Sequence, residues 1–262
     1  MKLFVDIGNT AIKWANEREL QSKVVHRASS RQIPESIDRA WLDMVAPSEV
    51  HIASVRTSQI TDRLTHWIAQ HWQVKARFSK ASQQELGVTT GYTSPSQLGV
   101  DRWLALLAAH HIGGGPKLVV DCGSATTVDG VDGLGRHLGG LILPGLQLIG
   151  KCLELNTDLS FGESGFELNG FATDTAAGIQ SGAMLTHLCV VERSLQELEQ
   201  RCGKTAECII TGGNADSLSA HLSATHQVIP DLVLQGLEQR CGKTAECIIT
   251  GGNADSLSAH LS

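Results

Sequence analysis

Apolar and polar positions along the chain predict short strands separated by polar turns. Continuous apolar runs typical of buried strands lie at residues 2–7, 50–55 and 207–213. The stretch "KLVVDCGSATTVDGV" at residues 117–131 predicts a strand, a turn and a second strand. A further apolar stretch, "HLGGLILPG", follows at residues 137–145.

Helical periodicity separates these strands. Residues 101–112 place apolar side chains such as Trp103 and Leu107 on one face, and three glycines followed by Pro116 end the pattern. Further helical stretches lie at residues 36–45, 175–200 and 215–222. Strands mixed with helices of this length predict an α/β protein. The glycines at 113–115 mark a domain boundary, so we predict an N-terminal domain at residues 1–112 and a C-terminal domain at residues 113–236.

The C-terminal part of the chain contains an exact internal duplication. "LEQRCGKTAECIITGGNADSLSAHLS" occupies residues 198–223 and recurs letter for letter at residues 237–262. Structural repeats normally diverge and come in at least ~3 copies. We therefore interpret the second copy as a recent duplication or an artefact of the sequence, and we assign no function to it. A chain cut after about Gly236 is expected to keep its activity.

Composition and charge exclude several classes of protein. Of the 262 residues, 42% are hydrophobic and 18% charged, and the net charge is −6, whereas a general nucleic-acid binder needs a basic face. No run approaches the ~18 apolar residues of a membrane span, and Asp6 interrupts the first apolar run too early for a signal peptide. Seven cysteines without a CxxC pair fit reduced thiols. We expect a cytoplasmic protein that binds neither nucleic acid nor membranes.

Two turns share one pattern of residues. "LFVDIGNT" at residues 3–10 and "LVVDCGSATT" at 118–127 both place Asp, any residue, Gly and small polar residues after an apolar strand. Glycine permits a tight turn, and free N–H groups and hydroxyls in such a turn bind anions. A carboxylate repels phosphate, so Asp6 and Asp121 make sense if a cation lies between acid and phosphate. One such turn fits a plain hairpin equally well, but two, one in each half, predict a nucleotide clamped between related domains.

Four motifs in this order resemble the type III pantothenate kinase family. They are "DIGNT" with Lys13, "GVDRW" at residues 99–103, "DCGSATT" at 121–127 and "GGLILPG" at 139–145. The resemblance covers most of residues 1–236 and implies two related actin-like (ribonuclease H-like) α/β domains with a nucleotide cleft between them. It also implies transfer of the ATP γ-phosphoryl group to the primary hydroxyl of pantothenate, the first step toward coenzyme A. Mg²⁺, a monovalent cation (K⁺ or NH₄⁺) and a homodimer are implied as well.

The resemblance assigns a role to individual residues. The ATP-binding residues would be Asp6, Ile7, Gly8, Asn9, Thr10, Ala11, Ile12, Lys13 and Ser124, where the family often has Thr. Pantothenate would contact Tyr92, Gly99, Val100, Asp101, Arg102 and Thr175. Asp101 would accept the proton, Asp121 would hold the monovalent cation, and Asp6 would lie near Mg²⁺. The "TGG" at residues 211–213 resembles the glycines on the adenosine side of the superfamily.

General chemistry agrees with these roles but leaves simpler readings open. A primary alcohol is a weak nucleophile, so a carboxylate must accept its proton during phosphoryl transfer, and an arginine can pair with the substrate carboxylate. Asp101 directly precedes a helix and could be an N-cap. Arg102 and Lys13 could be solvated surface charges, Tyr92 a packed loop residue, and Thr175 an ordinary hydroxyl at the start of a helix.

Two rival functions share these motifs. Another small-molecule kinase of the superfamily, for acetate or a sugar, would have both phosphate turns, although "GVDR" after Tyr92 speaks against it. A non-catalytic regulatory relative would keep the fold without the activity. The retained carboxylates Asp6, Asp101 and Asp121 favour an enzyme.

Overall fold

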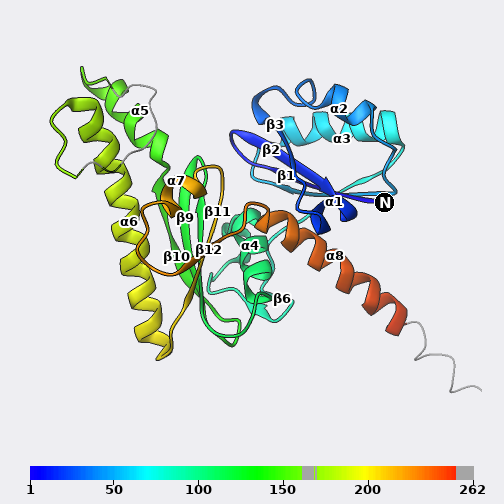
Figure 1. Ribbon diagram of the computed structural model, residues 1–262. Coiled ribbons are helices and arrows are strands. Elements are labelled where there is room, and N and C mark those ends of the chain that lie inside the picture. Colours follow the sequence, from blue (N-terminus) through cyan, green and yellow to red (C-terminus); the bar gives the residue numbers. More distant parts are fainter. Residues whose placement is uncertain (161–167, 169, 252–262) are drawn as a thin grey trace, which may run out of the picture.

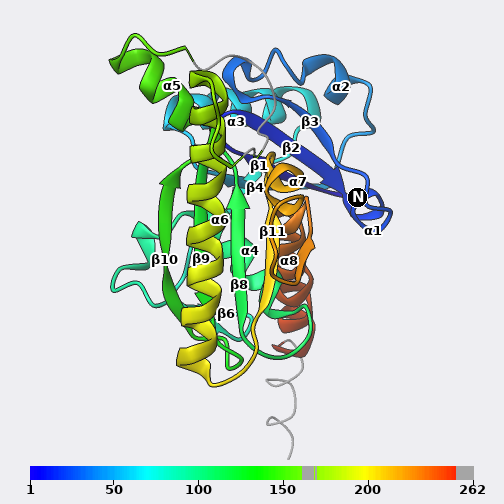
Figure 2. The ribbon, with the colours of Figure 1, turned by 60° about the vertical axis from the view of Figure 1, so that its left-hand side comes forward.

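Two five-stranded mixed sheets, one in each half of the chain, form the framework of the protein (Figure 1). The computed structural model describes residues 1–160, 168 and 170–251, with side chains up to residue 242. Helices cover both faces of each sheet (Figures 1 and 2). The predicted α/β class with two related domains is confirmed.

The strands and helices follow in mixed order along the chain. The strands are β1 (Lys2–Ile7), β2 (Ala11–Asn16), β3 (His26–Ser29), β4 (Glu49–Ser54), β5 (Ala76–Phe78), β6 (Gln84–Glu85), β7 (Val88–Thr89), β8 (Lys117–Cys122), β9 (Ala125–Val131), β10 (His137–Pro144), β11 (Glu207–Thr211) and β12 (His226–Val228). The helices are α1 (Glu17–Gln21), α2 (Asp38–Leu42), α3 (Ser58–Trp72), α4 (Val100–His110), α5 (Leu146–Asn156), α6 (Thr175–Cys202), α7 (Ala215–Ser219) and α8 (Leu232–Gly251), with 3-10 turns η1 (Ser30–Gln32) and η2 (Pro95–Gln97). Among these, no helix combines the length and the apolar character needed to span a bilayer.

The two large sheets have the same topology. The first sheet has the order β3-β2-β1-β4-β5 and the second β10-β9-β8-β11-β12. In each, three strands pair antiparallel and two further strands add in parallel. Strand β8 therefore occupies in the second sheet the place that β1 occupies in the first. The two similar turns of the sequence follow these two equivalent strands.

Strand β1 is buried on both faces, which explains its unbroken apolar run. Leu3, Val5 and Ile7 pack into a core cluster with residues of α2 and α3, whereas Phe4 points into a different cluster with α4 and α8. Strand β8 likewise divides its side chains between two clusters. Each sheet is thus the middle layer between helices.

Helices α4 and α8 lie between the two sheets (Figures 1 and 2). Helix α4 is apolar nearly all round, as expected of a helix buried on every side. The two helices approach closely at Gly236, where an added Cβ would lie 2.2 Å from the carbonyl oxygen of Leu104. Helix α4 therefore packs against both sheets, although its residues fall within the predicted N-terminal domain, residues 1–112. Helix α6 covers the opposite face of the second sheet (Figure 2).

The two identical segments have different structures. Residues 207–211 form β11 in the first copy, while their duplicates, residues 246–250, lie within α8. The second copy begins inside α8 with Leu237, which is 0% exposed. Arg240 Nε lies 2.8 Å from Glu85 Oε1 in an ion pair. Leu237 is therefore part of the folded core and Cys241 packs against it, whereas residues 252–262 lie outside the described residues.

Candidate active site between the two sheets

A cleft of about 370 Å³ opens where β1 and β8 end. Residues of both similar turns line it, together with one carboxylate from the first turn of α4. The sequence-predicted site residues that line the cleft are Asp6, Gly8, Asn9, Thr10, Ala11, Lys13, Asp101, Asp121 and Ser124. The structure thus brings together three acids that are far apart in the sequence.

The remaining predicted residues lie outside the lining of this cleft. Ile7 and Ile12 are 0% exposed and belong to the core cluster of the first sheet. Thr175 is the exposed first residue of α6. Four further predicted residues lie around the start of α4 without lining the cleft, namely Tyr92, Gly99, Val100 and Arg102.

The two similar turns, at residues 8–11 and 123–125, are built alike and touch each other. The N–H of Gly8 donates to the carbonyl of Ala11 at 3.0 Å, and the N–H of Gly123 donates to the carbonyl of Ala125 at 3.1 Å. Across the cleft, the hydroxyls of Thr10 and Ser124 form a hydrogen bond. These two hydroxyls are exposed and lie between the sheets, where an anion could accept hydrogen bonds from both.

The strand register places a base opposite the first acid. Asp6 on β1 is the direct partner of Lys13 on β2, so both side chains emerge on the same face and line the cleft. Lys13 Nζ donates to the carbonyl of Pro230 at 3.3 Å, which fixes the ammonium group beside the C-terminal segment. In the second sheet the partner of Asp121 is Thr127, so no lysine balances that carboxylate from the adjacent strand.

Burial raises the pKa values of the three acids, and repulsion from neighbouring acids adds to the rise at Asp6 and Asp121. Burial raises the pKa of Asp6 to about 7; Lys13 opposes this rise, and the charges of Asp101 and Asp121 add to it. Burial also raises the pKa of Asp121 to about 6, with a further contribution from Asp101. The pKa of Asp101 is raised by burial, while the N–H of Arg102 opposes the rise. A positive charge placed in the cleft would therefore lower these pKa values again and favour the ionised carboxylates.

The same acids set a limit on how a metal ion could bind. Within the part of the chain that the structure describes, no group of three His, Cys, Asp or Glu side chains is placed to hold one ion. A cation in the cleft would therefore take one or two carboxylate oxygens and complete its shell with phosphate oxygens and water. That incomplete protein shell is usual for Mg²⁺ at sites of phosphoryl transfer.

Asp101 is not the N-cap of α4. Gly99 takes that position, and Asp101 follows in the first turn, where its Oδ1 accepts the N–H of Arg102 at 2.8 Å. A Cβ at Gly99 would lie 2.5 Å from the same oxygen, so glycine leaves room for the carboxylate. The spacing of the "GVDR" motif thus has a steric reason.

Arg102 points away from the cleft into the interior. Its side chain is 5% exposed and forms an ion pair with Asp129 of β9, whose side chain is 2% exposed. Sequence reasoning did not single out Asp129 or its neighbour His137. Both occur in a glycine-rich stretch with no recognisable motif, so only the fold reveals them.

Sequence reasoning also missed several polar residues of the cleft. Arg27 of β3 is the direct strand partner of Lys13 and lines the cleft, as do Gln147 and Asn214. Gly212 has a φ of +97°, and a Cβ there would lie 2.4 Å from Asp121 Oδ1. The sequence did indicate Gly212 and Gly213, because they resemble the superfamily glycines. It gave no strand pattern for β3 that could have placed Arg27.

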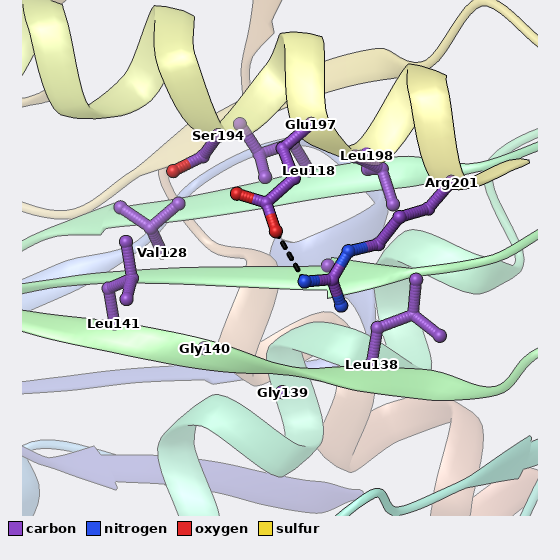
Figure 3. Close-up of a pocket in the computed structure, with 11 residues that line it drawn as sticks. Leu118, Val128, Leu138, Gly139, Gly140, Leu141, Ser194, Glu197, Leu198 and Arg201 are labelled. Atoms are coloured by element: carbon purple, nitrogen blue, oxygen red, sulfur yellow. Dashed lines mark hydrogen bonds and ion pairs between the residues drawn. The ribbon is translucent and has the colours of Figure 1, made fainter.

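A second cavity of about 340 Å³ lies between α6 and the hairpin of β9 and β10 (Figure 3). Leucines and the glycines Gly139 and Gly140 line it, and Glu197 forms an ion pair with Arg201 at its edge (Figure 3). None of the predicted site residues lines this cavity. The three clustered acids therefore identify the first cleft, between the sheets, as the candidate active site.

Comparison with known proteins gives one consistent result. Residues 2–197 match the model of the family described as type III pantothenate kinase. A protein of that name from Polaromonas sp. (strain JS666 / ATCC BAA-500) is 34% identical over 230 residues, which cover 84% of this chain and 89% of that protein. Another of that name from Nitrosospira multiformis is 36% identical over 222 residues, covering 84% of this chain and 83% of that protein.

Solved structures share the fold at low sequence identity. A Campylobacter jejuni protein assigned to a Baf family of transcriptional activators superimposes with a TM-score of 0.60 at 19% identity, covering 93% of this chain and 99% of that one. A Sinorhizobium meliloti protein assigned as a 2-dehydro-3-deoxygalactonokinase superimposes with a TM-score of 0.54 at 14% identity, again covering 93% and 99%. At these identities the likeness concerns the fold alone.

Proposed function

The chain belongs to the type III pantothenate kinase family, and from this premise we propose that it transfers the γ-phosphoryl group of ATP to pantothenate. The product would be 4'-phosphopantothenate, in the first step of coenzyme A biosynthesis. The observation that carries the proposal is the meeting of Asp6, Asp101 and Asp121 in one cleft between two matching turns. A cleft with this combination of acids and phosphate-binding turns suits a nucleotide with its cations.

The phosphate chain of ATP would lie between the two turns. Thr10 and Ser124 offer hydroxyls from opposite sides of the cleft, and Lys13 offers a positive charge beside Asp6. Phosphoryl transfer depends mainly on positioning and on neutralising charge. Groups fixed on the ends of two sheets supply both without reorganisation.

Asp101 would accept the proton of the pantothenate hydroxyl as the new P–O bond forms. Its carboxylate lines the cleft at the rigid start of α4, and burial raises its pKa. A raised pKa makes a carboxylate a stronger base for a weakly acidic alcohol. Gly99 keeps the space around this carboxylate free of a side chain.

The acids of the cleft fit the cations of the family. Asp6 would hold Mg²⁺ together with phosphate oxygens, and Asp121 would hold K⁺ or NH₄⁺, since both carboxylates line the cleft and burial disfavours their negative charge. Bound cations would neutralise the negative charge of the phosphates.

We place the enzyme in the cytoplasm and propose that it acts as a homodimer. Leu141 and Ile142, 51% and 65% exposed on edge strand β10, are apolar side chains that a second copy could cover.

A coupled assay of ADP release tests the proposed reaction. Turnover is measured with pantothenate, acetate and several sugars, and we expect pantothenate alone to support it. Faster turnover with acetate or a sugar would replace the proposal by a different kinase, and absence of turnover with every acceptor would favour a regulatory relative.

The variant Asp101→Asn tests the role of the base. We expect kcat to fall at least ~100-fold, because general-base catalysis contributes that much or more, while the KM for ATP stays near its wild-type value. The matched control is Asp62→Asn, which changes an exposed acid on α3 and should leave kcat unchanged. Near-normal turnover in Asp101→Asn would remove the assignment.

A further inference from the structure

The guanidinium group of Arg102 is locked behind the cleft by a buried carboxylate. Arg102 Nε donates to Asp129 Oδ2 at 2.8 Å and Nη2 donates to Asp129 Oδ1 at 2.6 Å. Both side chains are at most 5% exposed. A bidentate pair of this kind fixes the plane of the guanidinium as well as its position.

Two more side chains close the arrangement into a ring, which we call the quartet: the buried Arg102, Asp129 and His137, and the half-buried Tyr92. Arg102 Nη1 donates to the hydroxyl oxygen of Tyr92 at 2.9 Å. The ring of Tyr92 stacks on that of His137, with centroids 5.9 Å apart and planes 8° from parallel. His137 Nε2 lies 2.9 Å from Asp129 Oδ1. Each member thus contacts two others, and three of the five N–H donors of Arg102 are committed.

The surrounding backbone leaves space for the quartet. An added Cβ at Gly140 would lie 2.1 Å from Asp129 Oδ1 and 2.5 Å from Arg102 Nη2. An added Cβ at Gly91 would lie 2.3 Å from the carbonyl oxygen of His137. Glycine at these two positions lets the hairpin of β9 and β10 press against the loop that carries Tyr92.

The quartet is joined to the candidate base through the first turn of α4. Asp101 precedes Arg102, and its Oδ1 accepts the Arg102 N–H. Because Asp129 holds the guanidinium on the far side of the turn, Arg102 does not collapse onto the Asp101 carboxylate. Asp101 therefore stays directed into the cleft.

We propose that Asp129 and His137 are positioning residues that hold Arg102 and Tyr92 as a rigid support behind Asp101, at the acceptor end of the cleft. This inference rests on the proposed function. Arg102 and Tyr92 are the members that the family resemblance places at pantothenate, while nothing assigns a role to Asp129 or His137. This support would keep the Asp101 carboxylate directed at the acceptor hydroxyl, so loosening it should affect pantothenate more than ATP.

The charge pattern supports the same conclusion. Burial is the main cause of the raised pKa of Asp101; the positive charge of Arg102 lowers that pKa and the negative charge of Asp129 raises it. Asp129 thus offsets the effect of Arg102 on the neighbouring carboxylate.

The test compares two buried carboxylates of the same hairpin. Asp129→Asn removes the negative charge of the carboxylate and replaces one of its two acceptor oxygens by an amide NH₂ group. Asp132→Asn is the matched control, because Asp132 is 8% exposed, pairs with Arg136 at 2.6 Å and does not contact Arg102. Kinetics with pantothenate and with ATP as the varied substrate are measured together with urea unfolding. We expect Asp129→Asn to raise the KM for pantothenate ~10–100-fold, since the loss of a charge-assisted hydrogen bond has an effect of that size, with the KM for ATP changed less than ~3-fold.

A second variant keeps the inference testable if Asp129→Asn does not fold. His137→Gln retains a donor toward Asp129 but removes the ring that stacks on Tyr92, and it should raise the KM for pantothenate ~3–10-fold. Asp132→Asn should lower the urea midpoint without changing the ratio of the two KM values.

Three outcomes separate the possibilities. Wild-type KM values for both substrates in the quartet variants that fold, with wild-type turnover normal, overturn the positioning role alone. Equal increases in both KM values, matching those of Asp132→Asn, also overturn it, because they would reflect a general structural defect. Absence of turnover in the wild-type enzyme overturns the proposed function and this inference with it.

Discussion

Shortening the chain at the start of the second copy should destabilise the protein, although sequence reasoning expected that part to be dispensable. A chain ending at Gly236 loses Leu237, which is 0% exposed within the core formed with α4. Removing a buried leucine side chain costs roughly 2–5 kcal/mol. The lost ion pair between Arg240 and Glu85 adds at most about 1 kcal/mol, since both partners are partly exposed. The remaining stub of α8 would be too short to be helical by itself.

The expected loss is therefore about 2–6 kcal/mol, a large share of the 5–15 kcal/mol typical of a folded domain. With a urea m-value of about 2 kcal/mol/M, the midpoint of unfolding should fall by roughly 1–3 M. The control is a chain ending at Gly242, which keeps Leu237, Arg240 and Cys241 and should unfold at the same urea concentration as the full chain. Equal midpoints for the two shortened chains would refute the reasoning, because they would mean that the second copy contributes nothing to the core.

Three further predictions concern the cleft. Asp6→Asn should stabilise the cation-free protein by roughly 2–4 kcal/mol at pH 8 and leave its stability unchanged at pH 4. Because the pKa of Asp6 is raised to about 7 in the folded state, the folded protein keeps a proton between pH 4 and 7 that the unfolded chain has released. The stability of the wild-type protein therefore falls as the pH rises from 4 to 7. Urea unfolding in a chelating buffer at the two pH values checks this, and no gain at pH 8 would contradict it. Arg27→Gln should raise the KM for ATP about tenfold, because a charge-assisted hydrogen bond contributes ~1.5 kcal/mol or more; the exposed Arg31→Gln is the control, and equal KM values in the two variants would exclude a phosphate contact. Replacing K⁺ by Na⁺ should slow turnover, and a full rate in Na⁺ would count against Asp121 as a cation ligand.

The sequence predicted the parts of the fold that depend on strong local patterns. The strand at residues 2–7 matches β1 throughout, and the helix predicted at residues 101–112 is α4, two residues shorter at its C-terminus and one residue earlier at its start. Helix α3 was missed, although Leu64, Trp67 and Ile68 form a buried stripe, because polar residues occupy most of its other positions. Short strands such as β3 and β5 have half-exposed, charged sequences, and only pairing with their neighbours makes them strands.

The candidate site divides in the same way. The two aspartates one residue before the ends of β1 and β8 could be paired from the sequence, because each belongs to its own turn motif. Arg102 also lies in a motif, but the sequence did not reveal that its side chain is buried. Its partner Asp129 is 27 residues away and is brought close only by the folding of strand β9. The position of Arg27 in the cleft depends on the pairing of β3 with β2, which the residues around Arg27 do not predict. Short sequence motifs predict the turns, whereas contacts between strands that are distant in the sequence determine which charged side chains line the cleft.

The duplicated segment also gives the molecule an internal reference. Residues 207–211 and 246–250 have the same letters, the same preceding residues and the same chain. One set is a strand held between β8 and β12, and the other is part of a helix. Any difference between the two copies in hydrogen exchange, protease susceptibility or spectral signature must come from tertiary surroundings, because intrinsic propensity cancels in the comparison. Few proteins allow the influence of context on secondary structure to be read so directly within a single polypeptide.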